Sequence, residues 1–316
     1  MLDLLEPVGT TAASLADRLA GVSLGLLALG LALHAAKMAA RARAWHNIAA
    51  AAYPEERLRF RHSLGAYVCG IGTNAVVPAR TGELVKLGLF RRKAPGTAYQ
   101  GLASTLVTES LFDVVVAVAA VATGLALGWE SLGAPLPGPV TFLAGHPWLV
   151  GAAAAVVAGL VLALRRPAGR LLRRVTAGAS RGFLVLRRPR AYLGSVASWQ
   201  FGALGLRLAS ILCFLAAFHV PATLQTALLV IAVQSVANLV PLTPNGAVTQ
   251  QALLVLALGS SAGAASIVGF GAGAQLATVA AEVLLAAVAL VLMTGSLRWR
   301  AVVTPEPAEP APVYQP

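Results

Sequence analysis

The stretch "TNAVVPARTGELV", residues 73–85, places an arginine and a glutamate directly after the apolar run "SLGAYVCGIG" at 63–72. Such charges are costly in an apolar environment unless protein groups or water surround them. Arginines at 57, 59 and 61 precede the run, and Arg91, Arg92 and Lys93 follow the stretch. The way in which the chain accommodates this short segment between basic flanks decides its fold.

Amino-acid composition indicates whether this segment lies in a membrane or in water. Of the 316 residues, 58% are hydrophobic and 11% are charged, and the mean hydropathy is +0.76. A water-soluble domain carries about 25% charged residues, so the sequence predicts an integral membrane protein. A net charge of +12 would suggest nucleic acid as the partner of a soluble protein. Here the basic residues lie between apolar runs, as in membrane topology, so we expect no nucleic acid.

Several apolar runs are long enough to cross a bilayer core, which takes about 20 helical residues. These predicted crossings are residues 19–36, 101–128, 148–164, 193–218 and 273–293. Three further apolar runs are short or broken by proline and glycine, namely 63–78, 222–240 and 247–258. The predicted fold is therefore all-α and polytopic.

Basic residues predict the orientation, because Lys and Arg concentrate in cytoplasmic loops. Residues 37–62 contain six of them and residues 165–190 contain nine arginines, so we expect both segments to be cytoplasmic. Residues 1–17 and 129–147 contain neither Lys nor Arg. We therefore expect the chain to lie in the cell membrane, with its amino terminus outside and its carboxyl terminus in the cytoplasm. No basic region precedes the first run, so it is not a typical cleavable signal.

The segment 63–90 has basic residues on both flanks, whereas a single crossing must end on opposite sides of the membrane. We therefore predict a re-entrant hairpin: residues 63–75 enter, residues 76–82 turn, and residues 83–90 return. Irregular backbone at membrane depth is stable only where protein or a water-filled cavity satisfies its polar groups. The turn is expected to line a cavity.

A second segment repeats this pattern. "ANLVPLTPNGAVT" at 237–249 has asparagine, small apolar residues, proline, a polar turn and glycine in the same order as residues 73–85. Glu109 and Glu282 also align, at a shift of 282 − 109 = 173. Inverted repeats are common in transporters.

We therefore predict one membrane domain, residues 1–300, built as an inverted repeat with two re-entrant hairpins. Its parts are repeat one at 19–128, a linker crossing at 148–164, a basic cytoplasmic loop at 165–192 and repeat two at 193–295. The tail, residues 301–316, is rich in proline and is expected to be disordered.

Glu109 and Asp113 lie four residues apart in a predicted crossing, so they share one helix face. A charge at such a position costs about 2.5–3.5 kcal/mol on insertion scales, so this face should point toward protein. The pair could be catalytic, could carry protons, or could anchor Arg80 of the hairpin. We expect Arg80 within ion-pair reach of one carboxylate. Glu282 is expected to hydrogen-bond the backbone of the second hairpin.

The cysteines and histidines suggest no metal site. Cys69 and Cys213 both lie inside apolar runs, and the five histidines are dispersed. Neither the CxxC nor the HExxH spacing of common metal sites is present. We expect packing roles for the cysteines and neither a metal nor a cofactor.

Three motifs resemble a known family. They are "NAVVPARTGELVKLGLF" (74–90), "TLVTESLFDVVVAV" (105–118) and "NLVPLTPNGAVTQQALL" (238–254). They are similar to the transmembrane, flippase-like domain of the lysylphosphatidylglycerol synthases and their stand-alone relatives, across roughly residues 19–293. The third motif departs from the family pattern, because Asn245 and Val248 replace glycines and Gln251 replaces a glutamate.

The resemblance implies a non-enzymatic lipid translocase that moves a polar head group between leaflets. The head group could belong to a phospholipid, an aminoacylated lipid or a polyprenyl-linked glycolipid. No synthase activity is implied, because a proline-rich tail stands where the synthases carry an aminoacyl-transferase domain. The expected partners are membrane lipids, with a lipid-modifying enzyme in trans as a further candidate.

The expected substrate path runs between the two hairpins. Its residues are Asn74, Pro78, Arg80, Gly82, Glu83, Lys86, Glu109, Asp113, Asn238, Pro241, Pro244, Asn245, Gly246, Gln251 and Glu282. Arg80 and Lys86 would contact phosphate, and the helix that starts near Gly82 would offer free N–H groups.

Two other functions stay open. Undecaprenyl-pyrophosphate phosphatases also use paired re-entrant hairpins, but their P-G-x-S-R-S turn carries a serine, whereas "PARTG" offers only the neighbouring hydroxyl of Thr81. A membrane subunit that anchors a partner enzyme would explain the basic loop, yet it leaves the buried charges without a role.

The hairpin prediction can be tested by cysteine labelling. Cysteines placed at positions 60 and 92 should both react with a membrane-impermeant reagent from the cytoplasmic side. Labelling from opposite sides would contradict a re-entrant hairpin.

Overall fold

The computed structural model describes residues 21–77, 81–126, 181–237, 247–258 and 263–295. Within these residues the chain is helical and contains no strand, as predicted. The longer helices are α2 (Leu24–Ala52), α5 (Tyr99–Ala126), α10 (Ser198–Ala217) and α13 (Ala264–Thr294). The shorter ones are α3 (Phe60–Val76), α4 (Gly82–Lys93), α11 (Leu224–Ala237) and α12 (Ala247–Leu258).

Four helical segments are long and apolar enough to span a membrane, namely Leu24–Ala52, Tyr99–Ala119, Pro189–Ala217 and Ser266–Thr294. They correspond to four of the predicted crossings. The predicted crossing 148–164 and the tail 301–316 lie outside the described residues. Large apolar side chains on α13, such as Leu276 and Leu292, are exposed, which suits contact with lipid tails.

Helix α2 continues to Ala52, far beyond the predicted crossing 19–36, so the basic residues at 37, 41 and 43 lie on this helix and not in a loop between apolar runs. The sequence "MAARARAWHNIAAAA" at 38–52 is rich in alanine, the strongest helix former. The helix ends before Pro54, because proline disfavours a helical conformation at the preceding residue. Lys37 and Arg41 therefore lie on a helix that is long and apolar enough to span the membrane.

The described part of the predicted basic loop is folded against the bundle. Residues Arg181–Arg187 form a 3-10 helix, η2, that contacts α2 and α5. Its Gly182 N–H donates to Ser104 Oγ at 2.9 Å, and its carbonyl accepts from Thr108 Oγ1 at 2.9 Å. A short helix, α9 (Pro189–Tyr192), then leads through a π-helical segment, η3 (Leu193–Ala197), into α10.

Helices α3 and α4 form an antiparallel hairpin. Asn74 Oδ1 near the end of α3 accepts a hydrogen bond of 2.8 Å from the N–H of Gly82, the first residue of α4. Gly70 and Gly82 bring the two backbones into close contact. The helices of the second predicted hairpin, α11 and α12, also pack on each other. Both turns, at 78–80 and 238–246, lie outside the described residues.

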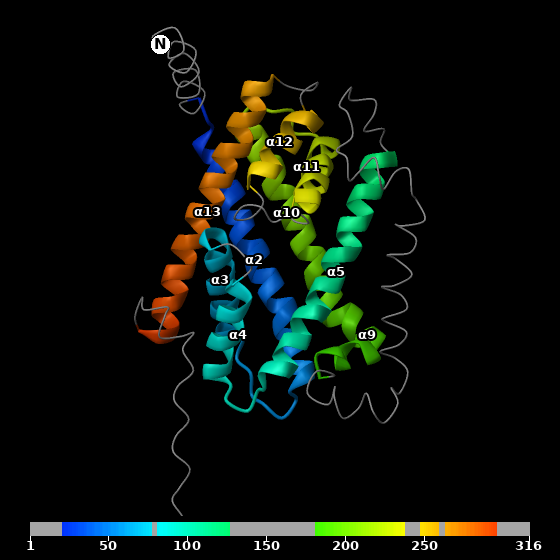
Figure 1. The fold of residues 1–316 in the computed structure, drawn as a ribbon, viewed down its shortest axis with the longest axis vertical. Coiled ribbons are helices and arrows are strands. Elements are labelled where there is room, and N and C mark those ends of the chain that lie inside the picture. The colour runs from blue at the N-terminus through cyan, green and yellow to red at the C-terminus, as the bar shows by residue number, and fades with distance from the viewer. Residues whose placement is uncertain (1–20, 78–80, 127–180, 238–246, 259–262, 296–316) are drawn as a thin grey trace, which may run out of the picture.

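Segments far apart in the sequence lie side by side (Figure 1). Helix α2 packs along α10, α3 packs against α13, and α11 packs against α5. One apolar core lies among α2, α3, α4 and α5 and includes Trp45, Tyr53 and Phe90. A second core lies among α10, α11, α12 and α13 and includes Leu215 and Ile231.

We predict that Gly82→Ala lowers the free energy of unfolding by about 1–3 kcal/mol, the usual cost of overpacking. The added Cβ would overlap the carbonyl oxygen of Gly70 and would lie 2.6 Å from Asn74 Oδ1. Gly202→Ala on α10 is the matched control, because nothing lies within 4 Å of its Cβ position. Thermal unfolding in detergent measures both variants. Equal melting temperatures would contradict the close approach of α3 and α4.

Candidate functional site

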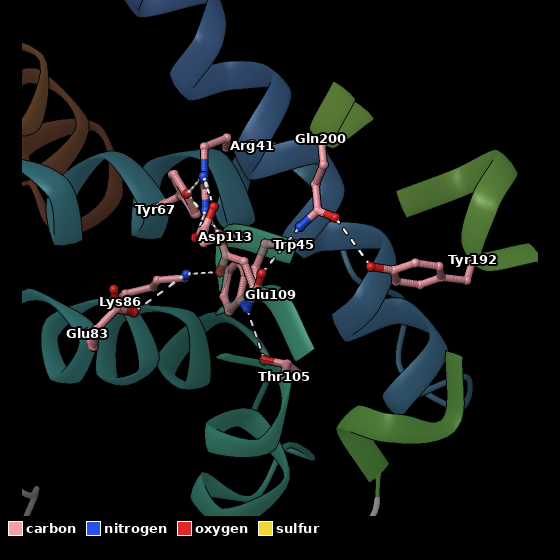
Figure 2. Close-up of polar contacts among 10 residues, drawn as sticks. All are labelled: Arg41, Trp45, Tyr67, Glu83, Lys86, Thr105, Glu109, Asp113, Tyr192 and Gln200. Atoms are coloured by element: carbon pink, nitrogen blue, oxygen red, sulfur yellow. Dashed lines mark hydrogen bonds and ion pairs between the residues drawn. The ribbon is translucent and has the colours of Figure 1, made fainter. Parts of the chain in front are cut away.

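The buried carboxylate of Glu109 joins four consecutive helices (Figure 2). Glu109 lies on α5 and is 6% exposed. Its Oε2 accepts a hydrogen bond of 2.8 Å from Lys86 Nζ of α4. Its Oε1 accepts from the Tyr67 hydroxyl of α3 at 2.8 Å and from Arg41 Nη2 of α2 at 3.3 Å. Two cations and a hydroxyl therefore compensate one buried acid.

Arg41 connects this buried carboxylate to Asp113, one turn further along α5. Its Nη1 and Nη2 donate to the two carboxylate oxygens of Asp113, both at 2.6 Å, and its Nε donates to the Tyr67 hydroxyl at 2.8 Å. Such bidentate pairs are the strongest hydrogen bonds between side chains. Since Arg41 binds both carboxylates, Glu109 and Asp113 share one helix face, as predicted.

Lys86 is enclosed by aromatic rings. Its side chain is almost fully buried, and its Nζ lies 4.5 Å from the ring centroid of Trp45 and 4.3 Å from that of Tyr67. Ring faces attract a desolvated ammonium group. Trp45 is itself fixed by a hydrogen bond of 2.9 Å from its Nε1 to Thr105 Oγ1. In this arrangement the ammonium of Lys86 points at Glu109, with the partly exposed Glu83 3.6 Å away.

A second polar cluster joins α2 to α13. His34 Nε2 lies 2.9 Å from Glu282 Oε1, and Lys37 Nζ lies 3.3 Å from His34 Nδ1. The tautomer with a proton on Nε2 satisfies both contacts, since Lys37 then donates to Nδ1. The described partner of Glu282 is thus a side chain of α2. The turn 238–246 of the second hairpin, with which a bond was expected, lies outside the described residues.

The two clusters border a cavity of about 490 Å³. Its lining comes from α2, α5, α10, α11, α12 and α13. The ionisable residues among the lining are His34, Lys37, Arg41, Asp113, Arg207 and Glu282. Amides and hydroxyls such as those of Gln234, Gln275 and Thr278 also face it. The bundle therefore holds a cavity with a partly polar and partly apolar lining, whose charged groups are available to a polar ligand.

The structure places the described residues of the expected path at different distances from this cavity. Asp113 and Glu282 line it, whereas Glu109 and Lys86 lie behind Arg41 in the buried cluster. Gln251 of α12 contacts α13 at Gly271. Seven expected residues lie outside the described residues, namely Pro78, Arg80, Asn238, Pro241, Pro244, Asn245 and Gly246.

The expectation that Arg80 pairs with Glu109 or Asp113 falls outside the described residues as well. Within them, the cations on these carboxylates are Arg41 and Lys86.

Sequence reasoning missed several residues of the site, namely His34, Lys37, Arg41, Trp45, Tyr67 and Arg207. A signal existed for some of them. His34, Lys37 and Arg41 are spaced three and four apart, which places them on one face of a helix. Arg207 lies inside the predicted crossing 193–218, where an ionisable residue by itself indicates a functional position. No pattern in the sequence indicates that Trp45 and Tyr67 enclose Lys86.

The described residues offer no metal site, because no three His, Cys, Asp or Glu side chains among them are grouped to hold an ion. Cys69 and Cys213 are free thiols. Cys69 is buried, and its Sγ lies 3.6 Å from the carbonyl oxygen of Ala286 on α13.

Comparison with known proteins gives one family. The model of the lysylphosphatidylglycerol synthase TM region matches residues 8–281. No curated protein and no solved structure gives a significant match. The matched range includes the motifs at 74–90, 105–118 and 238–254 that resemble this family, so the resemblance and the match agree.

We predict that Glu109→Gln lowers the free energy of unfolding by about 3–5 kcal/mol, because it leaves buried cations without their counter-charge. Glu83→Gln is the matched control, since Glu83 contacts the same Lys86 at 3.6 Å but is 42% exposed. This pair, in which one partner is partly exposed, is expected to contribute less than the Lys86–Glu109 pair. Chemical unfolding in detergent measures the free energy of unfolding of both variants. Equal decreases would contradict the prediction, because they would mean that burial does not make the Glu109 ion pairs more stabilising than the Glu83 pair.

Proposed function

We propose that this chain, which belongs to the lysylphosphatidylglycerol synthase transmembrane-region family, is a non-enzymatic translocase that moves polar lipid head groups between leaflets. The family and the four apolar helices make it a membrane protein. The observation that carries the proposal is the cavity of about 490 Å³, lined by charged residues of α2, α5, α10 and α13.

Such a cavity lowers the barrier that a head group meets in a lipid bilayer. A head group that crosses alone loses its hydration, and each unmatched polar group then costs several kcal/mol, roughly 2–7 for a neutral one. Hydrogen-bond donors and acceptors in the cavity replace water during the passage. Arg41, Lys37 and Arg207 supply charged donors, and Gln234 and Gln275 supply amides. The lipid tails would stay outside, against the apolar faces of the helices.

The packing of the helices supports the proposed inverted repeat. In this repeat α2 corresponds to α10, hairpin α3–α4 to α11–α12, and α5 to α13. Helix α3 contacts α13 while its counterpart α11 contacts α5, and α2 contacts α10. Exchanging the two halves leaves these contacts unchanged, as expected for repeats related by a two-fold axis. We propose that both hairpins are re-entrant, with the amino terminus outside and the carboxyl terminus in the cytoplasm.

Leaflet exchange in liposomes tests this function. Purified protein should accelerate the exchange of at least one fluorescent lipid, read by dithionite quenching, and should release no phosphate from a polyprenyl pyrophosphate. Phosphate release without lipid exchange would favour the phosphatase alternative. Neither activity, together with co-purification of a lipid-modifying enzyme, would favour the anchor alternative.

Two variants sharpen the assay. Arg80→Gln should abolish exchange of an anionic lipid while the protein stays folded, because Arg80 lies in the motif "PARTG" that the family pattern shares. Truncation after Thr304 should leave the exchange rate unchanged, since the removed tail contributes no residue to the proposed path. An unchanged rate of lipid exchange in the Arg80→Gln variant would contradict the assignment of Arg80 to the substrate path.

A further inference from the structure

Arg207 brings to the cavity a positive charge that no salt bridge with a described residue compensates. It lies on α10 inside the candidate span Pro189–Ala217. Its described hydrogen bond is from Nη2 to Gln234 Oε1 of α11, at 2.6 Å, and no carboxylate among the described residues lies within ion-pair distance. A guanidinium has five N–H donors in a planar fork. Arg207 therefore has donors left for a ligand.

Lys37 of α2 is the second cation with spare donors. Its described contact is with His34 Nδ1, at 3.3 Å, whereas an ammonium carries three donors. The carboxylate of Glu282 is engaged by the other ring nitrogen of His34. Lys37 and Arg207 line the same cavity, where Lys37 is attracted by Glu282 and repelled by Arg207. An anion between them would relieve this repulsion.

The third cation at the cavity is already paired. Asp113 binds both terminal nitrogens of Arg41. With His34 neutral, the formal charges on the described lining are Lys37, Arg41 and Arg207 against Asp113 and Glu282, which gives 3 − 2 = +1. The described lining of the cavity thus carries a positive surplus, and the cations with spare donors are Lys37 on α2 and Arg207 on α10.

We propose that Lys37 and Arg207 bind the phosphate of a lipid head group with a net negative charge. This assignment rests on the proposed function and names its substrate class. The guanidinium fork matches two phosphate oxygens, while a lysine acts as a point charge. A phosphodiester with one negative charge balances the surplus of +1 on the lining.

The same charges disfavour an aminoacylated head group. The ammonium group of such a head group would enter a cavity in which the charged groups with spare hydrogen-bonding capacity are cations. The carboxylates of the lining, Asp113 and Glu282, already bind Arg41 and His34. Hydroxyl-rich head groups meet suitable neutral partners in Gln234, Gln275 and Thr278. An anionic phospholipid with a glycerol or sugar head group fits these contacts.

Ligand-dependent unfolding tests the site without requiring transport. The full chain in neutral detergent is heated with a short-chain phosphatidylglycerol, a short-chain phosphatidylcholine, or inorganic phosphate, because a ligand that binds the folded state raises the melting temperature. The anionic lipid should act at a concentration about tenfold lower than the choline lipid, because both carry a phosphodiester and only the choline lipid brings an ammonium group close to Lys37 and Arg207. Inorganic phosphate should protect more weakly than the anionic lipid.

Variants of the two cations complete the test. Arg207→Gln and Lys37→Gln should each lose the preference for the anionic lipid, whereas Arg207→Lys should keep part of it because the charge remains. Arg43→Gln is the matched control, since Arg43 also lies on α2 but stacks on Phe60 at 5.2 Å and does not line the cavity. Elution on size-exclusion chromatography checks that each variant is folded. If Arg207→Gln does not fold, Arg207→Lys and Lys37→Gln carry the comparison.

The outcomes separate this site from the transport proposal. Equal protection by both lipids, or an unchanged preference in the folded Arg207→Gln or Lys37→Gln variant, overturns the site. Protection by inorganic phosphate equal to that by the anionic lipid overturns its assignment to a lipid. If the anionic preference and its loss are observed but liposomes show no leaflet exchange, the phosphate site is supported and translocation is wrong.

Discussion

A buried carboxylate in a membrane protein requires a counter-charge, and at Glu109 this requirement determines how four helices are arranged. Lys86, Tyr67 and Arg41 reach the two oxygens of Glu109 from α4, α3 and α2. Removing any one partner leaves a charge or a polar group in an environment that cannot solvate it. The hairpin α3–α4 is therefore held against α2 and α5 by specific charges as well as by apolar packing.

The same network connects the fold to the cavity. Arg41 Nη2 donates to the buried Glu109 and, together with Nη1, to Asp113, whose side chain is half exposed and lines the cavity. Arg41 and Asp113 are thus held in the cavity lining by ion pairs, while Lys37 and Arg207 line the same cavity with spare donors. In the proposed mechanism the Arg41–Asp113 ion pair maintains the shape of the cavity, and Lys37 and Arg207 bind the head group.

Much of the architecture could be predicted from the sequence, because composition and apolar run length report directly on a membrane environment. Helices were expected at α3, α4, α11 and α12, and the structure has them. The side chains that bind Glu109 could not be predicted in the same way. Counting basic residues assigned Arg41 to a cytoplasmic loop, since the alanine-rich continuation of α2 gives no hydropathy signal. The aromatic enclosure of Lys86 depends on Trp45 and Tyr67, which only tertiary packing brings together.

The central claim is that the Lys86–Glu109 pair holds the hairpin in place, and a double-mutant cycle tests it most directly. The free energy of unfolding in detergent is measured for the wild type, Lys86→Met, Glu109→Gln and the double variant. If the pair is coupled as the structure indicates, the double variant loses less than the sum of the single variants, by about 2 kcal/mol or more. Additive losses would contradict the claim, because they would mean that Lys86 and Glu109 stabilise the protein independently.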